Sequence, residues 1–364
     1  MSEYQIHSQG DVINSRYTVQ SFAGEGGMQE VYLAHDLHLQ KHVALKVPKN
    51  RSAQKRFQRS AVVSAKVNHP NVAKTLDYIE VSGAQYLVEE FIAGTDIKQG
   101  LLDRLEAVDP ALVAKAMHHT AKGLDASHRA GVIHRDLKPS NVMFTGGPGI
   151  REIKITDFGI AKMAGDEIAE AVEGGDASIS ASKTVVGALP YMAPEMITDP
   201  RNADRPSDVW AVGAMTYELL TGEPPFGVGL PAVPGILQAE PPLPPAGFAS
   251  KTQFKTLADE IHQILIACLS KDPAARPSAN QLAIRCEALC YSVDKRFAGV
   301  CSAIRPPGNT GFISQDGGGI VFFHRQSVYG PMPSVGDRVS FSSFPGYPYP
   351  RAHPIVLIKQ TSKG

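Results

Sequence analysis

The N-terminal quarter of the chain alternates between apolar and polar residues. Strand-like runs at 17–19, 31–33, 43–46 and 85–91 are separated by glycine-rich or charged turns. An alternation with a period of two is typical of antiparallel strands that bury one face. We therefore expect a small sheet in this region, preceded by a polar leader at residues 1–15.

The spacing becomes helical in the middle of the chain. Residues 53–68 and 111–130 place apolar side chains on one face, and Gly131 follows the second run as a helix stop does. Residues 224–245 are crowded with prolines, so we expect any helix there to be short. A mainly helical region is predicted between the two ends of the chain.

The period of two returns near the C-terminus. Short alternating runs lie at 297–301, 310–314, 320–324, 336–341 and 352–358. Short strands separated by Gly- and Pro-containing turns favour a small closed barrel of five strands. The expected organisation is a main domain at 16–290, divided into lobes at 16–92 and 93–290, then a linker at 291–296 and a barrel domain at 297–360.

Charge is balanced over the whole chain but unevenly distributed. The 364 residues contain 36 Lys and Arg against 36 Asp and Glu, with 43% hydrophobic residues. Residues 295–364 contain eight Lys and Arg but only two acids, a net charge of +6, which leaves −6 for the rest. A basic module on an acidic body indicates a nucleic-acid or acidic-protein partner.

Cysteine usage and the absence of targeting patterns favour a cytoplasmic protein. The four cysteines at 268, 286, 290 and 301 show no metal-ligand spacing, and we expect free, mostly buried thiols. The first residues lack a basic-then-apolar signal, and no apolar run is long enough to span a membrane. The oligomeric state is left open.

Three acidic motifs follow one another in the helical region. Residues 133–141 read Ile-His-Arg-Asp-Leu-Lys-Pro-Ser-Asn, residues 157–159 read Asp-Phe-Gly and residues 193–195 read Ala-Pro-Glu. In this order they resemble the catalytic, metal-binding and activation segments of protein kinases. The resemblance covers residues 16–290. It implies the two-lobed α+β kinase fold, with a small antiparallel-sheet lobe before a large helical lobe.

Phosphoryl transfer accounts for the residue types in these motifs. A carboxylate is needed to orient the attacking hydroxyl, which fits Asp136, and oxygen ligands are needed for magnesium, which fit Asn141 and Asp157. Lys138 matches the serine/threonine-specific kinases, where it would help to neutralise the transferred phosphate. The resemblance implies ATP and Mg²⁺ as cofactors and protein Ser or Thr hydroxyls as substrates.

The resemblance also implies a nucleotide site in the sheet. Glycines between two strands let the backbone approach a phosphate, and the Lys of Val-Ala-Leu-Lys at 43–46 would pair with phosphates. The nucleotide-contacting residues implied are Gly24, Glu25, Gly26, Gly27, Val31, Ala44, Lys46, Glu90, Ile92, Asn141 and Asp157. Gln29 replaces the family's third glycine, which we expect to stiffen the loop tip.

One ion pair of the family is missing from the sequence. The helix glutamate that normally pairs with the strand lysine is Ser60 here, and no acidic residue occurs between 51 and 71. Glu89 aligns with a position that is normally apolar and close to that lysine. Because a buried, unpaired carboxylate is costly, we hypothesise that Glu89 pairs with Lys46. The alternative is an alignment displaced by one residue, with Glu89 facing solvent.

The segment between the second and third motifs carries the regulatory candidates. Arg135 before the catalytic aspartate is typical of kinases that need a phosphate on this segment. The candidate acceptors are Thr184, our first choice, then Ser182, Ser180 and Ser178, and ordinary loop hydroxyls are the alternative reading. Ala188 replaces a threonine that contacts the catalytic aspartate in the family, so we expect a lower rate.

Three structural contacts are implied by the same resemblance. We expect Asp208 to hold the backbone of the catalytic loop and His134 to hydrogen-bond the metal-binding segment. Arg276 matches the arginine that pairs with the glutamate of Ala-Pro-Glu, here Glu195.

The C-terminal barrel resembles cold-shock domains. Gly-Phe-Ile at 311–313, Val-Phe-Phe-His at 321–324 and Gly-Asp-Arg-Val-Ser-Phe at 336–341 carry this resemblance. It implies binding of single-stranded RNA or DNA by stacking bases on aromatic rings. The implied contacts are Phe312, Phe322 and His324 for bases, with Arg325 and Arg338 for phosphates. The first strand lacks the usual aromatic residues, and each lost stack removes about 1–3 kcal/mol, so we expect weak binding.

Rival functions are compatible with this sequence. We expect a serine/threonine protein kinase of the bacterial, eukaryotic-like type that autophosphorylates its activation segment and acts on protein substrates. A pseudokinase that binds nucleotide and presents the barrel is the main alternative, because Ser60 and Ala188 are atypical. A barrel that contacts protein or regulates the kinase is the alternative to nucleic-acid binding.

Overall fold

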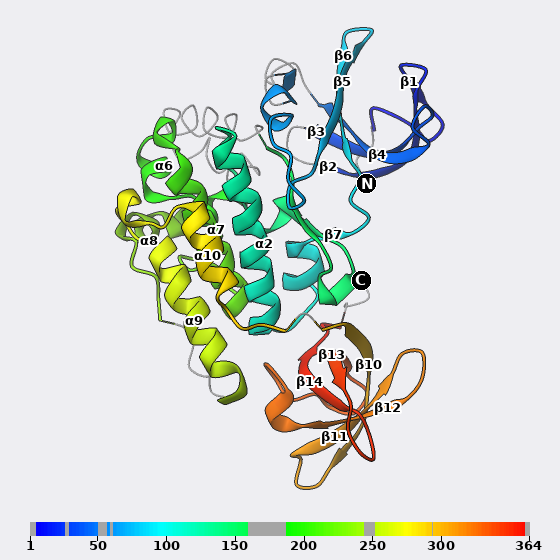
Figure 1. Cartoon of the computed structure of the whole chain (residues 1–364), viewed down its shortest axis with the longest axis vertical. Helices are drawn as coiled ribbons and strands as arrows, with labels where there is room; N and C mark the ends of the chain where they lie inside the picture. Colours follow the sequence, from blue (N-terminus) through cyan, green and yellow to red (C-terminus); the bar gives the residue numbers. More distant parts are fainter. Residues whose placement is uncertain are drawn as a thin grey trace.

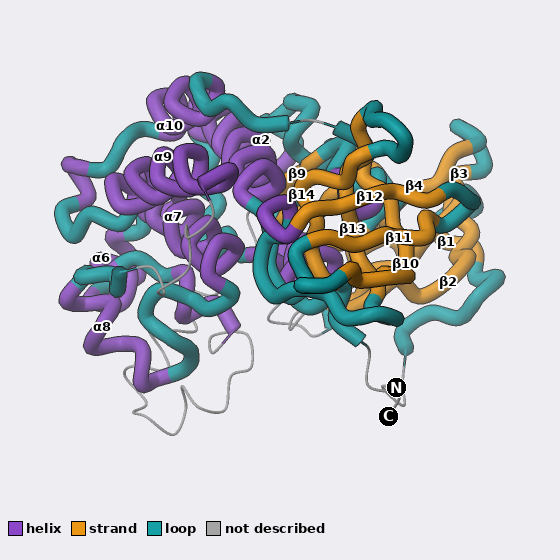
Figure 2. Tube along the Cα trace, turned by 90° about the horizontal axis from the view of Figure 1, so that it is seen from below, coloured by secondary structure: helices purple, strands orange, loops and turns teal. Residues whose placement is uncertain are grey.

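The protein consists of a sheet lobe, a helical lobe and a barrel, which follow one another along the chain (Figure 1). The computed structural model describes residues 5–25, 29–49, 57–58, 61–158, 187–243, 252–292 and 294–360. Figure 2 shows the barrel strands and the small-lobe strands on the same side of the helical lobe. Within the described residues, no helix combines the length and the apolar character that crossing a membrane requires.

The small lobe is a six-stranded sheet with the order β1-β2-β3-β4-β6-β5, in which all neighbours are antiparallel. Its strands are β1 Val12–Ile13, β2 Tyr17–Glu25, β3 Gln29–Asp36, β4 Lys41–Pro48, β5 Thr75–Val81 and β6 Ala84–Glu90. The alternating positions supply the buried side, with Tyr17, Tyr32 and Leu45 at most 1% exposed. Inside the expected leader, the backbone amides of Ile6 and His7 donate to side chains of β3.

The helix expected at 53–68 is described only in part. Residues 57–58 and 61–64 are helical, and Phe57 and Ala61 pack against Leu87 of β6. Ser60 lies outside the described residues.

The large lobe is built from helices around α7. Its helices are α2 Pro110–Arg129, α6 Pro194–Thr198, α7 Arg205–Thr221, α8 Val233–Gln238, α9 Thr252–Cys268 and α10 Ala279–Glu287. A small sheet with the order β7-β8-β9 faces them, with β7 Thr95–Asp96, β8 Val142–Phe144 and β9 Ile153–Ile155. Single helical turns lie at Lys98–Leu102, Pro139–Asn141, Gly147–Gly149, Leu189–Tyr191, Pro200–Asn202, Leu230–Ala232 and Pro273–Ala275. The helix predicted to be short, α8, has six residues.

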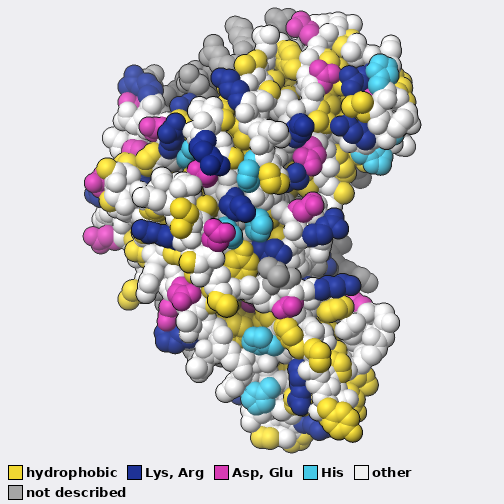
Figure 3. Space-filling model, in the orientation of Figure 1, with side chains coloured by type: hydrophobic (Ala, Val, Ile, Leu, Met, Phe, Trp, Pro, Cys, Tyr) yellow, Lys and Arg dark blue, Asp and Glu magenta, His cyan; other side chains and the backbone are white. Residues whose placement is uncertain are grey.

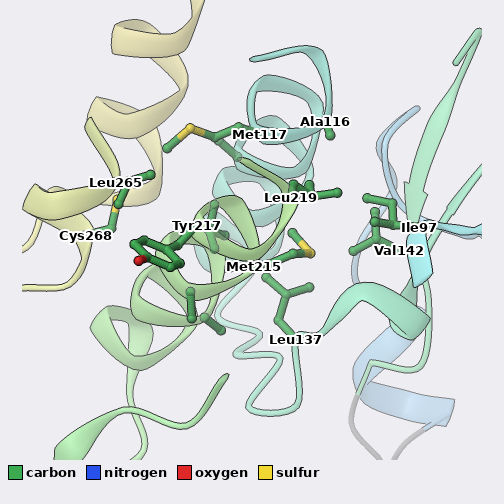
Figure 4. Close-up of a cluster of buried hydrophobic side chains, with 14 of the residues drawn as sticks. Ile97, Ala116, Met117, Leu137, Val142, Met215, Tyr217, Leu219, Leu265 and Cys268 are labelled. Carbon is green, nitrogen blue, oxygen red and sulfur yellow. The ribbon is translucent and has the colours of Figure 1, made fainter. Parts of the chain in front are cut away.

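The core of the large lobe lies where α2, α7 and α9 meet. Figure 4 shows Met117 of α2, Met215 of α7 and Leu265 of α9 in one buried cluster, and all three are fully buried. α7 begins with a capping box at Asp204 and ends at Gly222 in the left-handed conformation. Leu137 of the catalytic loop enters the same cluster, so the loop is anchored to the core.

The predicted C-terminal barrel is present and closed, with the strand order β10-β11-β12-β14-β13. Its strands are β10 Arg296–Arg305, β11 Thr310–Gln315, β12 Ile320–His324, β13 Arg338–Phe344 and β14 Arg351–Leu357, and a helical turn at Arg325–Ser327 follows β12. Ile313, Phe323 and Phe341 fill its interior at 1% exposure or less. Cys301 is also buried inside it, and all four cysteines are free.

The barrel is joined to the large lobe by backbone and side-chain contacts. The amide of Glu106 donates to the carbonyl of Leu357, and the amide of Lys359 donates to the carbonyl of Arg104. Tyr329 and Val356 of the barrel belong to the same buried hydrophobic cluster as the core of the large lobe. The ring of Tyr329 lies 5.1 Å from that of Phe254 in α9. The interface is therefore a continuation of the protein core.

Candidate active site

Hydrogen bonds to α7 fix the backbone of the catalytic loop. Asp208 in its first turn is 1% exposed and accepts hydrogen bonds from the amides of His134 and Arg135 at 2.8 and 2.7 Å. His134 is 2.8 Å from the carbonyl oxygen of Thr156, and its ring lies 4.7 Å from that of Phe158. Both contacts expected from the sequence are present. They fix the loop relative to the segment that carries Asp157.

Three predicted site residues meet in this loop. Nζ of Lys138 lies 2.9 Å from Oδ2 of Asp136. The side-chain nitrogen of Asn141 donates to the carbonyl oxygen of Asp136 at 2.7 Å and to its carboxylate at 3.1 Å. A lysine and an amide therefore orient the Asp136 carboxylate, and the amide oxygen of Asn141 takes no part in these hydrogen bonds, because only the nitrogen donates.

Lys46 is the centre of a buried charge cluster. Its Nζ lies 2.5 Å from Oε2 of Glu89 and 2.8 Å from Oδ1 of Asp157. Lys46 and Glu89 are 5% and 4% exposed. The hypothesised contact between Glu89 and Lys46 is present, and the solvent-facing alternative is wrong. Strand register explains it: Glu89 of β6 lies opposite Ala44 of β4, so it shares a face with Lys46 two residues further on.

The three titratable groups of this cluster shift one another's pKa values. Burial would lower the pKa of Lys46, but the charges of Asp157 and Glu89 outweigh burial and raise it. Burial raises the pKa of Glu89 against the opposing effect of Lys46. Burial would also raise the pKa of Asp157, but the charge of Lys46 and hydrogen bonds from Lys46 and Gln29 outweigh burial and lower it. Two carboxylates share one ammonium group, an arrangement that an additional cation would balance.

Sequence reasoning missed the contact of Gln29 with this cluster. Nε2 of Gln29 donates to Oδ1 of Asp157 at 2.8 Å. The sequence marks the position only as a replaced glycine, and nothing in it indicates which way the side chain points.

The residues expected around the adenine lie on three adjacent segments. Val31 of β3 pairs in register with Lys46, whereas Ala44 and Ile92 are 9% and 7% exposed. The carboxylate of Glu90 binds Lys154 at 3.0 Å, and its backbone amide donates to the carbonyl of Lys74 at 2.9 Å. Gly24 and Glu25 end β2, and Glu25 lies 2.6 Å from Lys49. Gly26, Gly27 and the acceptor candidates Thr184, Ser182, Ser180 and Ser178 lie outside the described residues.

The substrate-facing side shows the expected departure and the expected ion pair. Ala188 lines a small cavity together with Asp136 and Arg135, so a methyl group faces the place where a hydroxyl was expected. Glu195 binds Arg276 at 2.7 and 2.9 Å, as predicted. Arg276 also lies over the ring of Trp210, at 4.9 Å from the ring centre.

The barrel carries a cluster that we call the aromatic face, formed by Phe312, Phe322, Tyr349, Arg305 and Arg351. Phe312 and Phe322 are opposite each other in register, with ring centres 5.7 Å apart, and Tyr349 is 5.3 Å from Phe312. The guanidinium groups of Arg305 and Arg351 lie over the two phenylalanine rings at 4.6 and 4.5 Å. Hydrophobic side chains gather at the end of the barrel that is remote from the helices (Figure 3).

The other barrel candidates differ in their surroundings. His324 is the last residue of β12 and lies two positions after Phe322, so both side chains share one face of the strand. His324 and Arg325 are both exposed. Arg338 instead binds Asp316 through two hydrogen bonds of 2.7 and 2.5 Å. Sequence reasoning missed Arg305, Tyr349 and Arg351, although Tyr-Pro-Tyr-Pro-Arg at 347–351 combines aromatic and basic residues in one turn.

The geometry of this site is typical of one class of enzymes. A lysine from a sheet lobe faces the carboxylate and amide ligands of a helical lobe, as in phosphotransferases that bind a nucleotide between two lobes. The model of the protein kinase domain family matches residues 17–285. The chain belongs to this family, and the expected two-lobed fold followed by a closed barrel is confirmed.

Named relatives agree with this assignment. The chain is 32% identical to serine/threonine-protein kinase pkn3 of Myxococcus xanthus, an alignment covering 93% of this chain and 59% of the relative. It is 30% identical to serine/threonine-protein kinase PknB of Mycobacterium tuberculosis, covering 72% of this chain and 41% of PknB. This chain thus spans about half the length of these relatives.

A solved structure shows the same likeness. The chain is similar to the kinase domain of Mycobacterium tuberculosis PknI, solved as a point mutant, with a TM-score of 0.56 and 25% identity. The match covers 78% of this chain and 98% of that one. The resemblance of the barrel to cold-shock domains stays a prediction.

Proposed function

We propose that this chain is a serine/threonine protein kinase that transfers the γ-phosphate of ATP to protein hydroxyls, including its own. The observation that carries the proposal is the orientation of Asp136 by Lys138 and Asn141 beside the Lys46 cluster. Asp136 orients the attacking hydroxyl and accepts its proton, and Lys138 balances charge on the phosphate in transfer.

The donor groups fit magnesium and ATP. Asn141 uses its amide nitrogen on Asp136, so its oxygen remains for a hard cation, and Asp157 adds a carboxylate. The shortage of positive charge around Lys46 also favours a cation. Bound magnesium would neutralise the phosphates, while Lys46 binds phosphate and Val31, Ala44 and Ile92 surround the base.

We assign Glu89 the structural role of the missing helix glutamate. It holds Lys46 from the neighbouring strand, so the lysine stays in place without an acidic residue in the helix that contains Ser60. The consequence is that this ion pair does not depend on movement of that helix.

Replacing Glu89 by Gln should therefore lower nucleotide affinity and autophosphorylation by about 10-fold. The substitution removes a buried negative partner at nearly constant shape and leaves Lys46 to Asp157 alone. Calorimetric titration with an ATP analogue and a labelled-phosphate assay measure the two quantities. Glu80→Gln is the matched control, because Glu80 is exposed on β5 and has no role in the nucleotide site. Unchanged affinity and labelling in Glu89→Gln would refute the role.

Arg135 favours control by phosphorylation. Its backbone is in the left-handed region with φ of 66°, and its Nε is buried without a hydrogen-bond partner among the residues that the structure describes. A guanidinium group with an unused N–H can donate hydrogen bonds to a phosphate group on the segment that carries Thr184, Ser182, Ser180 and Ser178. Thr184 remains our first choice as acceptor.

The test of transfer is an assay with γ-labelled ATP. Magnesium-dependent incorporation of label that is stopped by EDTA supports the kinase. Incorporation no higher than in Asp136→Asn, together with retained nucleotide binding, supports the scaffold that binds nucleotide without transfer.

A second function is proposed for the aromatic face, which is weak binding of single-stranded nucleic acid. Edge-to-face rings with arginines above them provide surfaces for bases and charges for phosphates. The net charge of +6 over residues 295–364 supports the same partner. A protein ligand is the alternative occupant.

Two arginine variants distinguish these occupants. In polarisation titrations of the full chain with single-stranded RNA and DNA, Arg351→Ala should weaken binding and reduce the salt slope by about 0.7. Arg338→Ala should change neither, because Asp316 already occupies that guanidinium. Absence of binding by the wild-type chain at low salt would contradict the nucleic-acid function and favour a protein ligand.

A further inference from the structure

Gln29, at the start of β3, forms a direct hydrogen bond with Asp157, the proposed metal ligand. It is the first residue of β3, next to the loop at 26–28, and its side chain is 6% exposed. Its Nε2 lies 2.8 Å from Oδ1 of Asp157, across 128 positions of sequence. A glycine at this position could not make the contact, because it has no side chain.

The chemistry of the contact fixes the orientation of the amide. A carboxylate only accepts hydrogen bonds, so the amide nitrogen must face Asp157. Oε1 of Gln29 is then buried without a hydrogen-bond partner among the described residues. An unpaired buried oxygen is unfavourable, so the net stability of the hydrogen bond between Gln29 and Asp157 is reduced. Gln29 can therefore release Asp157 readily when Asp157 gains another partner.

Oδ1 of Asp157 already accepts two hydrogen bonds. Lys46 and Gln29 both donate to it at 2.8 Å, whereas among the described residues Oδ2 has a 3.4 Å contact with the hydroxyl of Thr156. A cation that binds Oδ1 needs the same lone pairs, and an N–H donor placed there competes with it. The φ of Asp157, 62°, shows that its backbone is also held in an unusual conformation.

We propose that Gln29 is a positioning residue that sets the magnesium requirement of the kinase. In the absence of metal its amide holds Asp157 and draws the first residue of β3 onto the metal ligand. Magnesium that binds Oδ1 of Asp157 must displace this amide, so metal binding and the contact between Gln29 and Asp157 are coupled. The inference rests on the proposed role of Asp157 as a metal ligand and deepens it.

The test is the magnesium dependence of nucleotide affinity, measured by calorimetry with a non-hydrolysable ATP analogue on the full chain. Gln29→Met keeps the length of the side chain and removes the N–H donor. The magnesium concentration that gives half of the full affinity gain should fall by about 5–10-fold, as expected for one lost hydrogen bond. Affinity in EDTA should stay within about 2-fold of the wild-type value, because the amide competes with metal only.

Two further variants make the outcome decisive. Gln40→Met is the matched control, because Gln40 is exposed and donates to the carbonyl of Leu37 in the turn after β3. The magnesium requirement of this variant should equal that of the wild-type chain. Gln29→Asn shortens the side chain by one methylene, loses the same bond and should shift in the same direction as Gln29→Met. An unchanged or higher magnesium requirement in folded Gln29→Met and Gln29→Asn, checked by thermal melting, overturns the inference.

The result also separates this inference from the proposed function. Magnesium-dependent binding without phosphoryl transfer would count against the kinase activity and leave the role of Gln29 standing. Nucleotide binding by the wild-type chain that does not respond to magnesium would remove Asp157 as a metal ligand, and with it the role of Gln29.

Discussion

The Asp136→Asn variant is expected to transfer phosphate about 10²–10⁴ times more slowly than the wild-type chain. Asparagine cannot accept the proton of the attacking hydroxyl at neutral pH. The substitution also removes the charge that pairs with Lys138 at 2.9 Å. The side chain keeps its size, so the bond from Asn141 to the backbone carbonyl at 2.7 Å should persist and the loop should keep its shape. Initial rates of labelled-phosphate incorporation at saturating ATP and magnesium measure the effect.

Nucleotide binding distinguishes lost chemistry from a damaged site. Asp136→Asn should bind an ATP analogue about as tightly as wild type, because the Lys46 cluster is untouched. Asp259→Asn is the control for the substitution itself, since that carboxylate pairs with Lys255 on α9, away from the catalytic loop. A rate in Asp136→Asn that matches the rate in Asp259→Asn would show that Asp136 is not the catalytic base.

The sequence predicted the parts of this molecule that depend on local pattern. Alternation by two marks four strands of the small-lobe sheet and the five strands of the barrel, but it did not indicate β1, β5 or the small sheet β7-β8-β9. The order of the three acidic motifs indicates which loops face each other. The pairing of Glu89 with Lys46 could also be predicted, because register within an antiparallel sheet determines which side chains share a face. One shift of register would have turned Glu89 to the opposite face of the sheet.

The contacts that the sequence did not indicate join distant segments through side-chain direction. Gln29 reaches Asp157 across 128 positions, and Arg296 reaches Asp109 across 187. The aromatic face gains Arg305 from the last position of β10 and Arg351 from the first position of β14, where alternation does not indicate which ring a long side chain covers. These contacts depend on how finished elements pack against one another, and a linear motif contains no information on packing.

The two departures from the family pattern have different physical consequences. Glu89 supplies a carboxylate to Lys46 from a strand, so the loss of the helix glutamate is offset within the site. Ala188 supplies no hydroxyl beside Asp136, and the two hydroxyls that line the same cavity, those of Tyr191 and Ser207, donate to Glu218 and Glu195 instead. We therefore expect nucleotide binding to be nearly intact and the rate of transfer to be reduced.

A buried ion pair crosses the interface between the barrel and the large lobe. A guanidinium nitrogen of Arg296 donates to both carboxylate oxygens of Asp109, at 2.9 and 2.8 Å, and the two side chains are 3% and 1% exposed. Asp109 also caps the N-terminus of α2, where the amides of Ala111 and Leu112 reach it at 3.2 and 3.4 Å. α2 leads directly into the catalytic loop, so this pair connects the barrel to the helix that positions Asp136.

Arg296→Ala should lower the free energy of unfolding by about 3–5 kcal/mol, because it leaves the Asp109 carboxylate buried without its cation. Urea denaturation of the full chain, followed by fluorescence and far-UV circular dichroism, measures the loss. Arg338→Ala is the matched control in the same barrel. It breaks an arginine–aspartate pair with 44% and 51% exposed side chains, and screening by water should leave stability little changed.

A double variant separates the lost pair from the lost packing. Asp109→Asn with Arg296→Met removes both charges, while the asparagine still caps α2 and the methionine fills part of the space. This variant should recover much of the stability that Arg296→Ala loses, since no buried charge is left alone. If Arg296→Ala is as stable as Arg338→Ala, the barrel is not fixed to the kinase by this pair. If the double variant is no more stable than Arg296→Ala, packing rather than charge holds the interface.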